Sequence, residues 1–335
     1  NGSGAIELVD QTLLPGETQI RRDTDLEQVI HDIQRLAVRG APALGVAGAL
    51  GTALIAAQVP DLDLARSEAM RLREARPTAV NLSWGVDRAL TRLEEGPEAV
   101  LAEALAIRDE DIASCTSMGL YGAEFVRTLV ERDRARIMTI CNTGGLAAVE
   151  RGTALGVIQT IFEQGWLDEA LPLETRPLLQ GARLTAWELT QMAAPFRLVV
   201  DSAGPFLLSR GAADAVFVGA DRIAANGDTA NKIGSFSLAL AARRAGVPFI
   251  VVAPETTVDM NTATGDDIEI EDRGSAEVVS FAGRQTAPAG TRTINPAFDV
   301  TPHDLITAIV TDRRVVRPSA GQTMADVPFG PIRTA

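Results

Sequence analysis

The pattern of hydrophobic and polar positions changes near Arg134, and the change predicts two parts with different architectures. Before it, apolar residues recur mainly at helical spacing, as in Asp25 to Val38. After it, short apolar runs rich in β-branched residues alternate with helical segments. Such alternation is typical of an α/β fold with a mostly parallel sheet that is covered by helices on both faces. We therefore expect two domains, residues 1–132 and residues 133–335.

The first part is predicted to be a mainly helical domain with a small β element. A short strand is expected within Ala5 to Leu14, before a Pro15-Gly16 turn. Helices are predicted at 25–38, 44–57, 64–73 and 84–93, with two more between 98 and 130. Arg76 and Asn81 are expected on or beside a turn, where a packed surface loop explains them as well as a ligand site does.

The second part is predicted to be an α/β domain with a mostly parallel sheet. Strands are expected at 137–141, 170–176, 198–201, 215–218 and 247–253, and helices at 152–164, 185–194, 205–210, 235–244 and 303–310. Residues 224–232 are predicted to be a loop, and 295–302 a rigid turn that caps the last helix. The polar segment 256–297 is expected to border the active site rather than to form a domain, and the tail from 317 is expected to be loop-like.

Several functional groups follow predicted strands of this second part. They are Cys141 with Asn142, Gln180, Asp201 and Asp221. The carboxyl ends of parallel strands line one crevice, where ligands bind. A thiol and a carboxyl group there can serve as an acid/base pair, which makes Cys141 and Asp221 candidates. An isolated cysteine in an apolar strand is more often a small buried hydrophobe, and Cys115 is interpreted so.

Composition narrows the classes of partner. The net charge is −13, which disfavours nucleic acid and anionic membranes as partners. Lys232 is the only lysine among 31 basic residues, either through coding bias or because a compact ammonium group is needed there. Two cysteines and two histidines give no pattern for a disulfide framework or a metal site. We expect no dinucleotide or triphosphate site, because no G-x-G-x-x-G or G-x-x-x-x-G-K-[ST] motif is convincing.

The membrane and targeting signals are weak. The apolar stretch from Ala41 to Ala57 is rich in Ala and Gly and is expected to fall short of a membrane span. The sequence shows no basic segment followed by an apolar one near its start, so we expect no signal peptide and a cytoplasmic location.

Six long motifs then resemble one family across nearly the whole chain. They are RGAPALGVAGALG from Arg39, RPTAVNLSWGVDR from Arg76, CNTGGLA from Cys141, ETRPLLQGARLTAWEL from Glu174, VGADRIAANGDTANKIGS from Val218 and NPAFDVTP from Asn295. Together they resemble methylthioribose-1-phosphate isomerase. The wider group includes ribose-1,5-bisphosphate isomerase and the regulatory subunits of the initiation-factor exchange complex.

The resemblance implies an aldose–ketose isomerase of methionine salvage that acts on a phosphosugar, without metal or cofactor, as a homodimer. The fold that it implies is an N-terminal helical domain with a small sheet and a Rossmann-like C-terminal domain. It implies that Cys141 and Asp221 are the catalytic pair. It also implies substrate contacts from Arg39, Gly40, Ala41, Arg76, Gln180, Asn231 and Lys232.

Two departures from the family pattern leave alternatives open. Ile140 stands where the family usually has His, and the 201–205 loop contains Pro205. A 5-deoxy- or 5-fluoro-5-deoxyribose 1-phosphate is therefore an alternative substrate. A non-catalytic regulatory or scaffold subunit is the alternative from another functional class.

Overall fold

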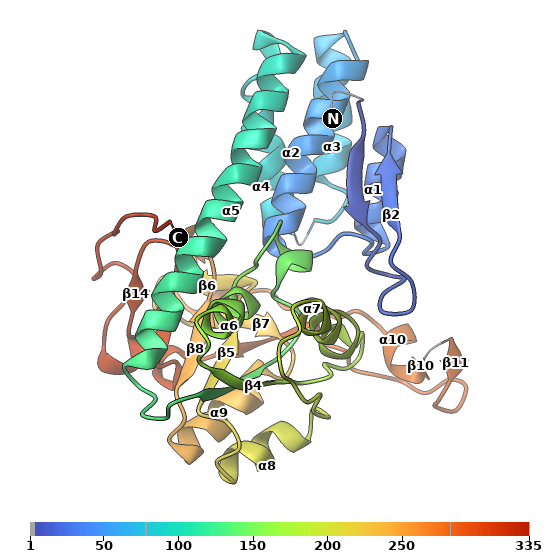
Figure 1. The fold of residues 1–335 in the computed structure, drawn as a ribbon. Coiled ribbons are helices and arrows are strands. Elements are labelled where there is room, and N and C mark those ends of the chain that lie inside the picture. Colours follow the sequence, from blue (N-terminus) through green and yellow to red (C-terminus); the bar gives the residue numbers. More distant parts are fainter. Residues whose placement is uncertain (1–3, 78, 282, 335) are drawn as a thin grey trace. The chain divides into compact units, whose positions relative to one another are not determined.

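The computed structural model describes residues 4–77, 79–281 and 283–334 (Figure 1). Its internal contacts divide the chain into two compact units. Unit 1 comprises residues 1–116, 143–152 and 333–335, and unit 2 comprises 117–142 and 153–332. The segment that follows Cys141 and Asn142 therefore belongs to unit 1, although both flanking stretches belong to unit 2.

Unit 1 is a helical assembly with one β-hairpin. Strands β1 (Ile6–Val9) and β2 (Ile20–Asp23) pair antiparallel. They are followed by α1 (Leu26–Gln34), α2 (Ala41–Gln58), α3 (Leu62–Arg73), α4 (Val80–Leu90) and the first part of α5 (Pro97–Arg127). Asp25 caps α1 by accepting a hydrogen bond from the Gln28 N–H, as expected of a residue at that position.

Helix α2 is the buried centre of unit 1. It packs against α4 at a close crossing, where a Cβ on Gly85 would lie 2.0 Å from the Gly45 carbonyl oxygen. By length and composition α2 could cross a membrane, contrary to our expectation, but 67% of it is buried inside the structure. That burial is the usual condition of a core helix, so the apolar composition is explained without a bilayer.

Unit 2 is built on a six-stranded sheet. The strand order is β14-β13-β8-β5-β3-β4, and every pair is parallel except β13 with β14. The strands are β3 (Ala135–Thr139), β4 (Leu167–Pro172), β5 (Ala215–Val218), β8 (Phe249–Val252), β13 (Ala308–Val310) and β14 (Val315–Val316). This arrangement confirms the predicted fold class.

Helices cover both faces of this sheet. Helix α6 (Ala154–Glu163) contacts β3, β4 and β5 on one face, and α9 (Ser235–Ala245) contacts β5 and β8 on the other (Figure 1). Helix α8 (Ala203–Ser209) packs beside α9, and the short α7 (Ala186–Gln191) follows a π-helical turn at Gly181–Thr185. Strand burial on both faces follows from this cover, as in most parallel sheets.

A second, smaller sheet lies in unit 2 with the order β12-β7-β6-β9. Its strands are β6 (Arg222–Ala224), β7 (Thr229–Lys232), β9 (Val258–Asp259) and β12 (Phe298–Thr301). Residues 224–232, predicted to be a loop, therefore form most of a hairpin. The predicted capping turn at 295–302 contains β12, and the predicted helix 303–310 is a short 3-10 turn followed by β13.

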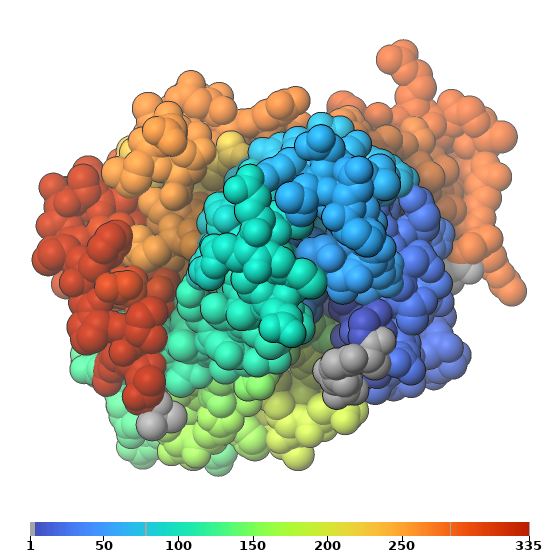
Figure 2. All heavy atoms as spheres, turned by 90° about the horizontal axis from the view of Figure 1, so that it is seen from above, coloured from blue at the N-terminus to red at the C-terminus, as the bar shows by residue number. Residues whose placement is uncertain are grey.

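Other boundaries differ from the predictions as well. Residues 97–127 form one helix rather than two, and α4 begins at Val80, so that Asn81 lies in a helix. The predicted strand 198–201 makes only an isolated bridge, between Leu173 and Val199. The segment 256–297 stays within unit 2, and part of it forms an arm from α10 (Ala276–Val279), β10 (Ser280–Phe281) and β11 (Arg284–Gln285) that projects outward (Figure 2).

Candidate functional site

Three neighbouring strands of the main sheet lead into the candidate residues of unit 2. Strands β5, β3 and β4 lie side by side and parallel, so their carboxyl ends meet at one edge. Cys141 follows β3 by two residues, and Asp221 follows β5 by three. The structure therefore brings the thiol and the carboxyl group to the same edge of the same sheet.

The two candidate catalytic residues differ in environment. Cys141 is buried, whereas Asp221 is exposed. The Asp221 N–H donates to the carbonyl of Ala230 at 2.8 Å, which ties its backbone to strand β7. The backbone of Asp221 is thus held at a fixed place beside β7.

The backbone of Cys141 adopts a conformation that side chains disfavour. Its φ angle is +65°, in the left-handed region. For a residue with a Cβ this conformation costs about 1–2 kcal/mol. Such strain persists only where the surroundings determine it, and it is frequent at functional sites. The strand-to-turn junction at Cys141 is therefore a built feature of the fold.

The residue after Cys141 is also fixed from neighbouring elements. The Asn142 side-chain amide donates to Glu188 Oε1 at 2.6 Å and to Thr185 Oγ1 at 3.3 Å. Asn142, Thr185 and Glu188 are all buried. Neither Thr185 nor Glu188 was singled out by the sequence, because both lie more than 40 residues further along the chain.

Gln180 begins the π-helical turn that leads to Thr185. Its side chain is 5% exposed, and its Oε1 atom is buried without a hydrogen-bond partner among the described residues. A buried amide oxygen without a partner is costly, and such groups are often explained by an absent ligand or water.

Asp201, another candidate at a strand end, has a structural position. Its two carboxylate oxygens accept the backbone N–H groups of Thr175 at 2.7 Å and Arg176 at 2.6 Å. The carboxyl group therefore closes the turn after β4. Arg176 in turn holds the projecting arm, because its guanidinium donates to the Glu277 carbonyl and lies over the Phe281 ring.

Asn231 and Lys232 lie at the end of β7. The buried Asn231 amide donates to Ser235 Oγ at 2.8 Å, at the start of α9. Lys232 is half-buried, and its ammonium group donates to the Ala297 carbonyl at 2.9 Å and lies 4.6 Å from the centre of the Phe298 ring. The single lysine is thus a positioned group rather than a free surface charge.

The amino end of α9 carries its own anion. The Asp299 carboxylate accepts the N–H groups of Gly234 at 2.7 Å and Phe236 at 3.1 Å. Burial raises the pKa of Asp299 to about 6, although these N–H groups and the Lys232 charge oppose the increase. The positive end of the α9 dipole, next to Lys232, is therefore already paired with the Asp299 carboxylate.

The remaining candidates lie in unit 1. Gly40 precedes α2 with a φ of +101°, and a Cβ there would lie 2.4 Å from the Ala147 carbonyl oxygen. Ala41 is the first residue of α2, and Arg39 Nε donates to Gln11 Oε1 at 3.3 Å. Arg76 is half-buried at the turn before α4. No group of three or more His, Cys, Asp or Glu suited to a metal ion occurs among the described residues.

Comparison with known proteins places the chain in a family. The profile of the Initiation factor 2 subunit family matches residues 37–318. Methylthioribose-1-phosphate isomerases from Pelotomaculum thermopropionicum and Chloroflexus aurantiacus are each 48% identical to it. The alignments cover 95% and 94% of this chain, and 90% and 93% of those proteins.

Two further relatives widen the range of names. A probable bifunctional methylthioribose-1-phosphate isomerase/methylthioribulose-1-phosphate dehydratase from Nocardia farcinica is 49% identical over 93% of this chain, which spans only 58% of that protein. A 5-deoxyribose 1-phosphate isomerase from Moorella thermoacetica is 45% identical over 98% of this chain and 97% of its own length.

Solved structures agree with the sequence comparison. The 5-methylthioribose 1-phosphate isomerase of Pyrococcus horikoshii OT3 has a TM-score of 0.86 and 40% identity, over 94% of this chain and 91% of its own. A structure from A. fulgidus described as translation initiation factor eIF-2B subunit delta has a TM-score of 0.84 and 40% identity, over 93% of both chains. The chain belongs to the Initiation factor 2 subunit family, and within it is similar to the methylthioribose-1-phosphate isomerases.

Proposed function

We propose that this protein converts 5-methylthioribose 1-phosphate into 5-methylthioribulose 1-phosphate, a step of methionine salvage, in the cytoplasm. The observation that carries the proposal is the pair of groups at one sheet edge, the buried Cys141 after β3 and the exposed Asp221 after the adjacent β5. The names of relatives that are 48% identical to the chain supply the substrate class.

The chemistry requires only proton and hydrogen transfers. In the aldose 1-phosphate the anomeric hydroxyl is esterified, so the ring opens only if an acid protonates the ring oxygen. The net isomerisation moves a hydrogen from C2 to C1 and the 2-hydroxyl proton to the former ring oxygen. In the proposal Asp221 handles the oxygen-bound protons, and Cys141 carries the proton between C2 and C1 if the path is an enediol one. A direct hydride shift is the competing route.

The proposed substrate contacts are Arg39, Gly40, Ala41, Arg76, Gln180, Asn231 and Lys232. The cations among them would offset the phosphate dianion in an acidic chain. The unpartnered Gln180 Oε1 supports a polar ligand group at that position.

The first prediction tests the catalytic pair. Cys141→Ala and Asp221→Asn should each lower kcat/KM by about 100-fold or more, the scale of losing a general acid or base. Production of ketose phosphate is followed by phosphorus NMR. Each variant should keep the wild-type far-ultraviolet circular dichroism spectrum, because each substitution removes few buried atoms. Near-normal turnover by either variant would remove that residue from the mechanism.

The second prediction concerns the 5-substituent of the substrate. It is motivated by the relative from Moorella thermoacetica, which is named a 5-deoxyribose 1-phosphate isomerase. Ile140, which replaces the usual His, is buried in the sheet core, and a Cβ on Gly234 would lie 2.9 Å from its Cδ1 atom. We expect kcat/KM for the methylthio substrate to exceed that for the 5-deoxy and 5-fluoro-5-deoxy substrates by no more than about 200-fold, since one apolar group contributes about 10–200-fold. A larger preference would show strict selection for the methylthio group.

The alternative from another functional class is a non-catalytic regulatory subunit. The reason to consider it is that the similar A. fulgidus structure is described as a translation initiation factor subunit. Phosphorus NMR distinguishes the two. No ketose phosphate from any of the three substrates, with well-folded protein, would favour the non-catalytic role.

We also propose a homodimer. Helices α8 and α9 pack together in unit 2, and both expose large apolar side chains. These are Phe206 on α8 and Phe236 and Leu240 on α9, and the segment before α8 exposes Leu198 and Val200. A second copy of the chain, joined through the same surface, would cover them on both partners.

A further inference from the structure

Two buried threonines hold the backbone of Cys141 from opposite sides. Thr175 Oγ1 accepts the Cys141 N–H at 2.8 Å, and Thr185 Oγ1 donates to the Cys141 carbonyl at 2.6 Å. Both threonines are at most 1% exposed. The donor and the acceptor of one strained residue are therefore both satisfied by side chains rather than by a neighbouring strand.

Thr175 is itself fixed at the end of β4. Its hydroxyl donates to the Leu173 carbonyl at 2.9 Å while it accepts from Cys141. Its own φ is +68°, and its N–H is held by Asp201 at 2.7 Å. Since Leu173 N–H donates to the Thr139 carbonyl at 2.8 Å, the ends of β3 and β4 are joined by one continuous chain of hydrogen bonds.

Thr185 reaches Cys141 through the π-helical turn. The turn spans Gly181–Thr185, and a Cβ on Gly181 would lie only 1.6 Å from the Leu173 carbonyl oxygen. Glycine is required there so that the turn can approach β4. The wider π turn then places Gln180 at its start and Thr185 at its end, which is a common use of π turns at functional sites.

We propose that Thr175 and Thr185 are positioning residues for Cys141. Together they keep its backbone in the left-handed conformation and thereby fix where the thiol lies. Neither is proposed to touch the substrate. This inference rests on the proposed catalytic role of Cys141, and it adds the residues that set the geometry of that group.

Loss of either threonine hydroxyl should change the backbone conformation of Cys141. Without the Thr175 acceptor or the Thr185 donor, one buried polar group of Cys141 loses a hydrogen bond, and the strained φ loses part of its support. The residue can then relax toward an ordinary φ, which moves the sulfur. Displacement of a reacting group by about 1 Å can cost on the order of 100-fold in rate.

The test compares Thr175→Val and Thr185→Val with Thr175→Ser and Thr185→Ser. Valine keeps the shape and removes the hydroxyl, whereas serine keeps the hydroxyl. We expect each Val variant to lower kcat by about 10–100-fold with little change in KM, and each Ser variant to stay within about threefold of the parent. Thr139→Val is the matched control, because the buried Thr139 hydroxyl on β3 has no hydrogen-bond partner among the described residues.

A second measurement does not depend on turnover. In a Cys115→Ala parent, Cys141 is the only thiol, and its alkylation by iodoacetamide is followed against pH. Both Val variants should change the rate of alkylation, and the Ser variants and Thr139→Val should not. If a Val variant fails to fold, Asp201→Asn is used instead. It weakens the hydrogen bond from the Thr175 N–H to Asp201 and should also change the rate of Cys141 alkylation.

The outcomes separate the two hypotheses. If the wild type isomerises its substrate and the Val variants lower only the melting temperature, with unchanged kcat and alkylation profile, the threonines are merely structural and the inference is wrong. If the wild type isomerises none of the three substrates, the proposed function fails. The alkylation profiles then still decide whether Thr175 and Thr185 control the Cys141 thiol.

Discussion

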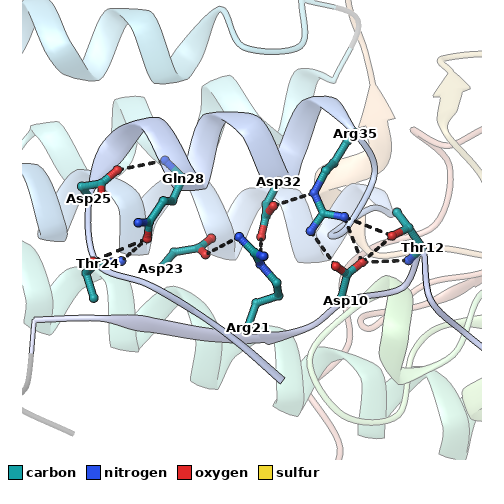
Figure 3. A network of polar contacts seen from close by, with 9 residues as sticks. All are labelled: Asp10, Thr12, Arg21, Asp23, Thr24, Asp25, Gln28, Asp32 and Arg35. Carbon is teal, nitrogen blue, oxygen red and sulfur yellow. Dashed lines mark hydrogen bonds and ion pairs between the residues drawn. The ribbon is translucent and has the colours of Figure 1, made fainter. Parts of the chain in front are cut away.

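At the residue scale, the buried carboxyl groups of unit 1 differ in the arginines that pair with them (Figure 3). Asp32 accepts hydrogen bonds from Arg21 Nε at 3.0 Å and Arg35 Nε at 2.7 Å, and Arg35 also pairs with Asp10 at 2.6 Å. Asp23 is fully buried and lacks a hydrogen-bond partner among the described residues, with Arg21 Nη2 3.9 Å from its Oδ1. Burial, with the like charge of Asp32, raises the pKa of Asp23 to about 6.

This raised pKa makes stability depend on pH with a definite sign. The folded protein binds the Asp23 proton more tightly than the unfolded chain, whose Asp pKa is about 3.9. Asp23 therefore contributes stability below about pH 4 and loses it as the pH rises through about 6. The free energy of unfolding of Asp23→Asn, relative to that of the wild type, should therefore rise by about 1–3 kcal/mol as the pH increases from 4 to 8.

Urea unfolding at several pH values measures this difference. Asp10→Asn is the matched control, because burial raises the Asp10 pKa but hydrogen bonds from Arg35 and Thr12 outweigh it and lower the pKa overall. That variant should lose stability at pH 8, where Asp23→Asn gains it. A pH-independent difference between Asp23→Asn and the wild type would show that Asp23 is ionised throughout.

At the scale of elements, the sequence predicts the central strands and most helices but not the smaller sheet. Gly227 and Asp228 sit among small polar residues, so the short β6 and β7 lack the alternation that marks a strand. The apolar residues of 303–310 fit a helix as well as a strand, and the pairing of β13 with β8 decides for the strand. Such pairing depends on residues more than 50 positions away, which periodicity does not report.

The same limit applies to the site. Cys141 and Asp221 can be found because each follows an apolar run, and Lys232 because it is the only lysine. Thr175, Thr185 and Asp299 could not be found, since each is defined by a partner 34 to 65 residues away. Motif resemblance marks the segments that contain them but not the contacts that they make.

The pairing of β7 with β12 gives Lys232 its setting and a testable role. Phe298 lies opposite Lys232 in the register, and the Ala297 carbonyl holds both the ammonium group and the Ile233 N–H. Lys232→Met should raise KM and lower kcat/KM by about 100-fold or more, through loss of a charge-assisted hydrogen bond and of positioning. Lys232→Arg should not restore activity, because a planar guanidinium does not reproduce the ammonium geometry.

Steady-state kinetics decide this point. Arg197→Met is the control, because it removes a cation whose side chain is exposed and pairs with Glu169 at the surface. Exposed ion pairs contribute little, so this variant should behave like the wild type. Wild-type kinetics for Lys232→Met would instead show that the lysine only stabilises the contact between β7 and the start of β12.

At the scale of the whole molecule, the chain carries a net charge of −13, so two copies repel each other unless a local surface attracts them. The surface of α8 and α9 is suited to do so, because Phe206 is 59% exposed and Leu240 is 47% exposed. Burial of such apolar area stabilises association by roughly 25 cal/mol per Å² before the costs of binding.

We therefore expect light scattering after size exclusion to give about twice the 35.4 kDa chain mass, and Leu240→Asp or Phe206→Asp to give the chain mass. A carboxylate placed there would be buried without a partner in the dimer but solvated in the monomer, which shifts the equilibrium toward the monomer. Leu101→Asp is the matched control, since Leu101 is 42% exposed on α5 in unit 1. A dimer that survives both substitutions on α8 and α9 would place the contact on another surface of the chain.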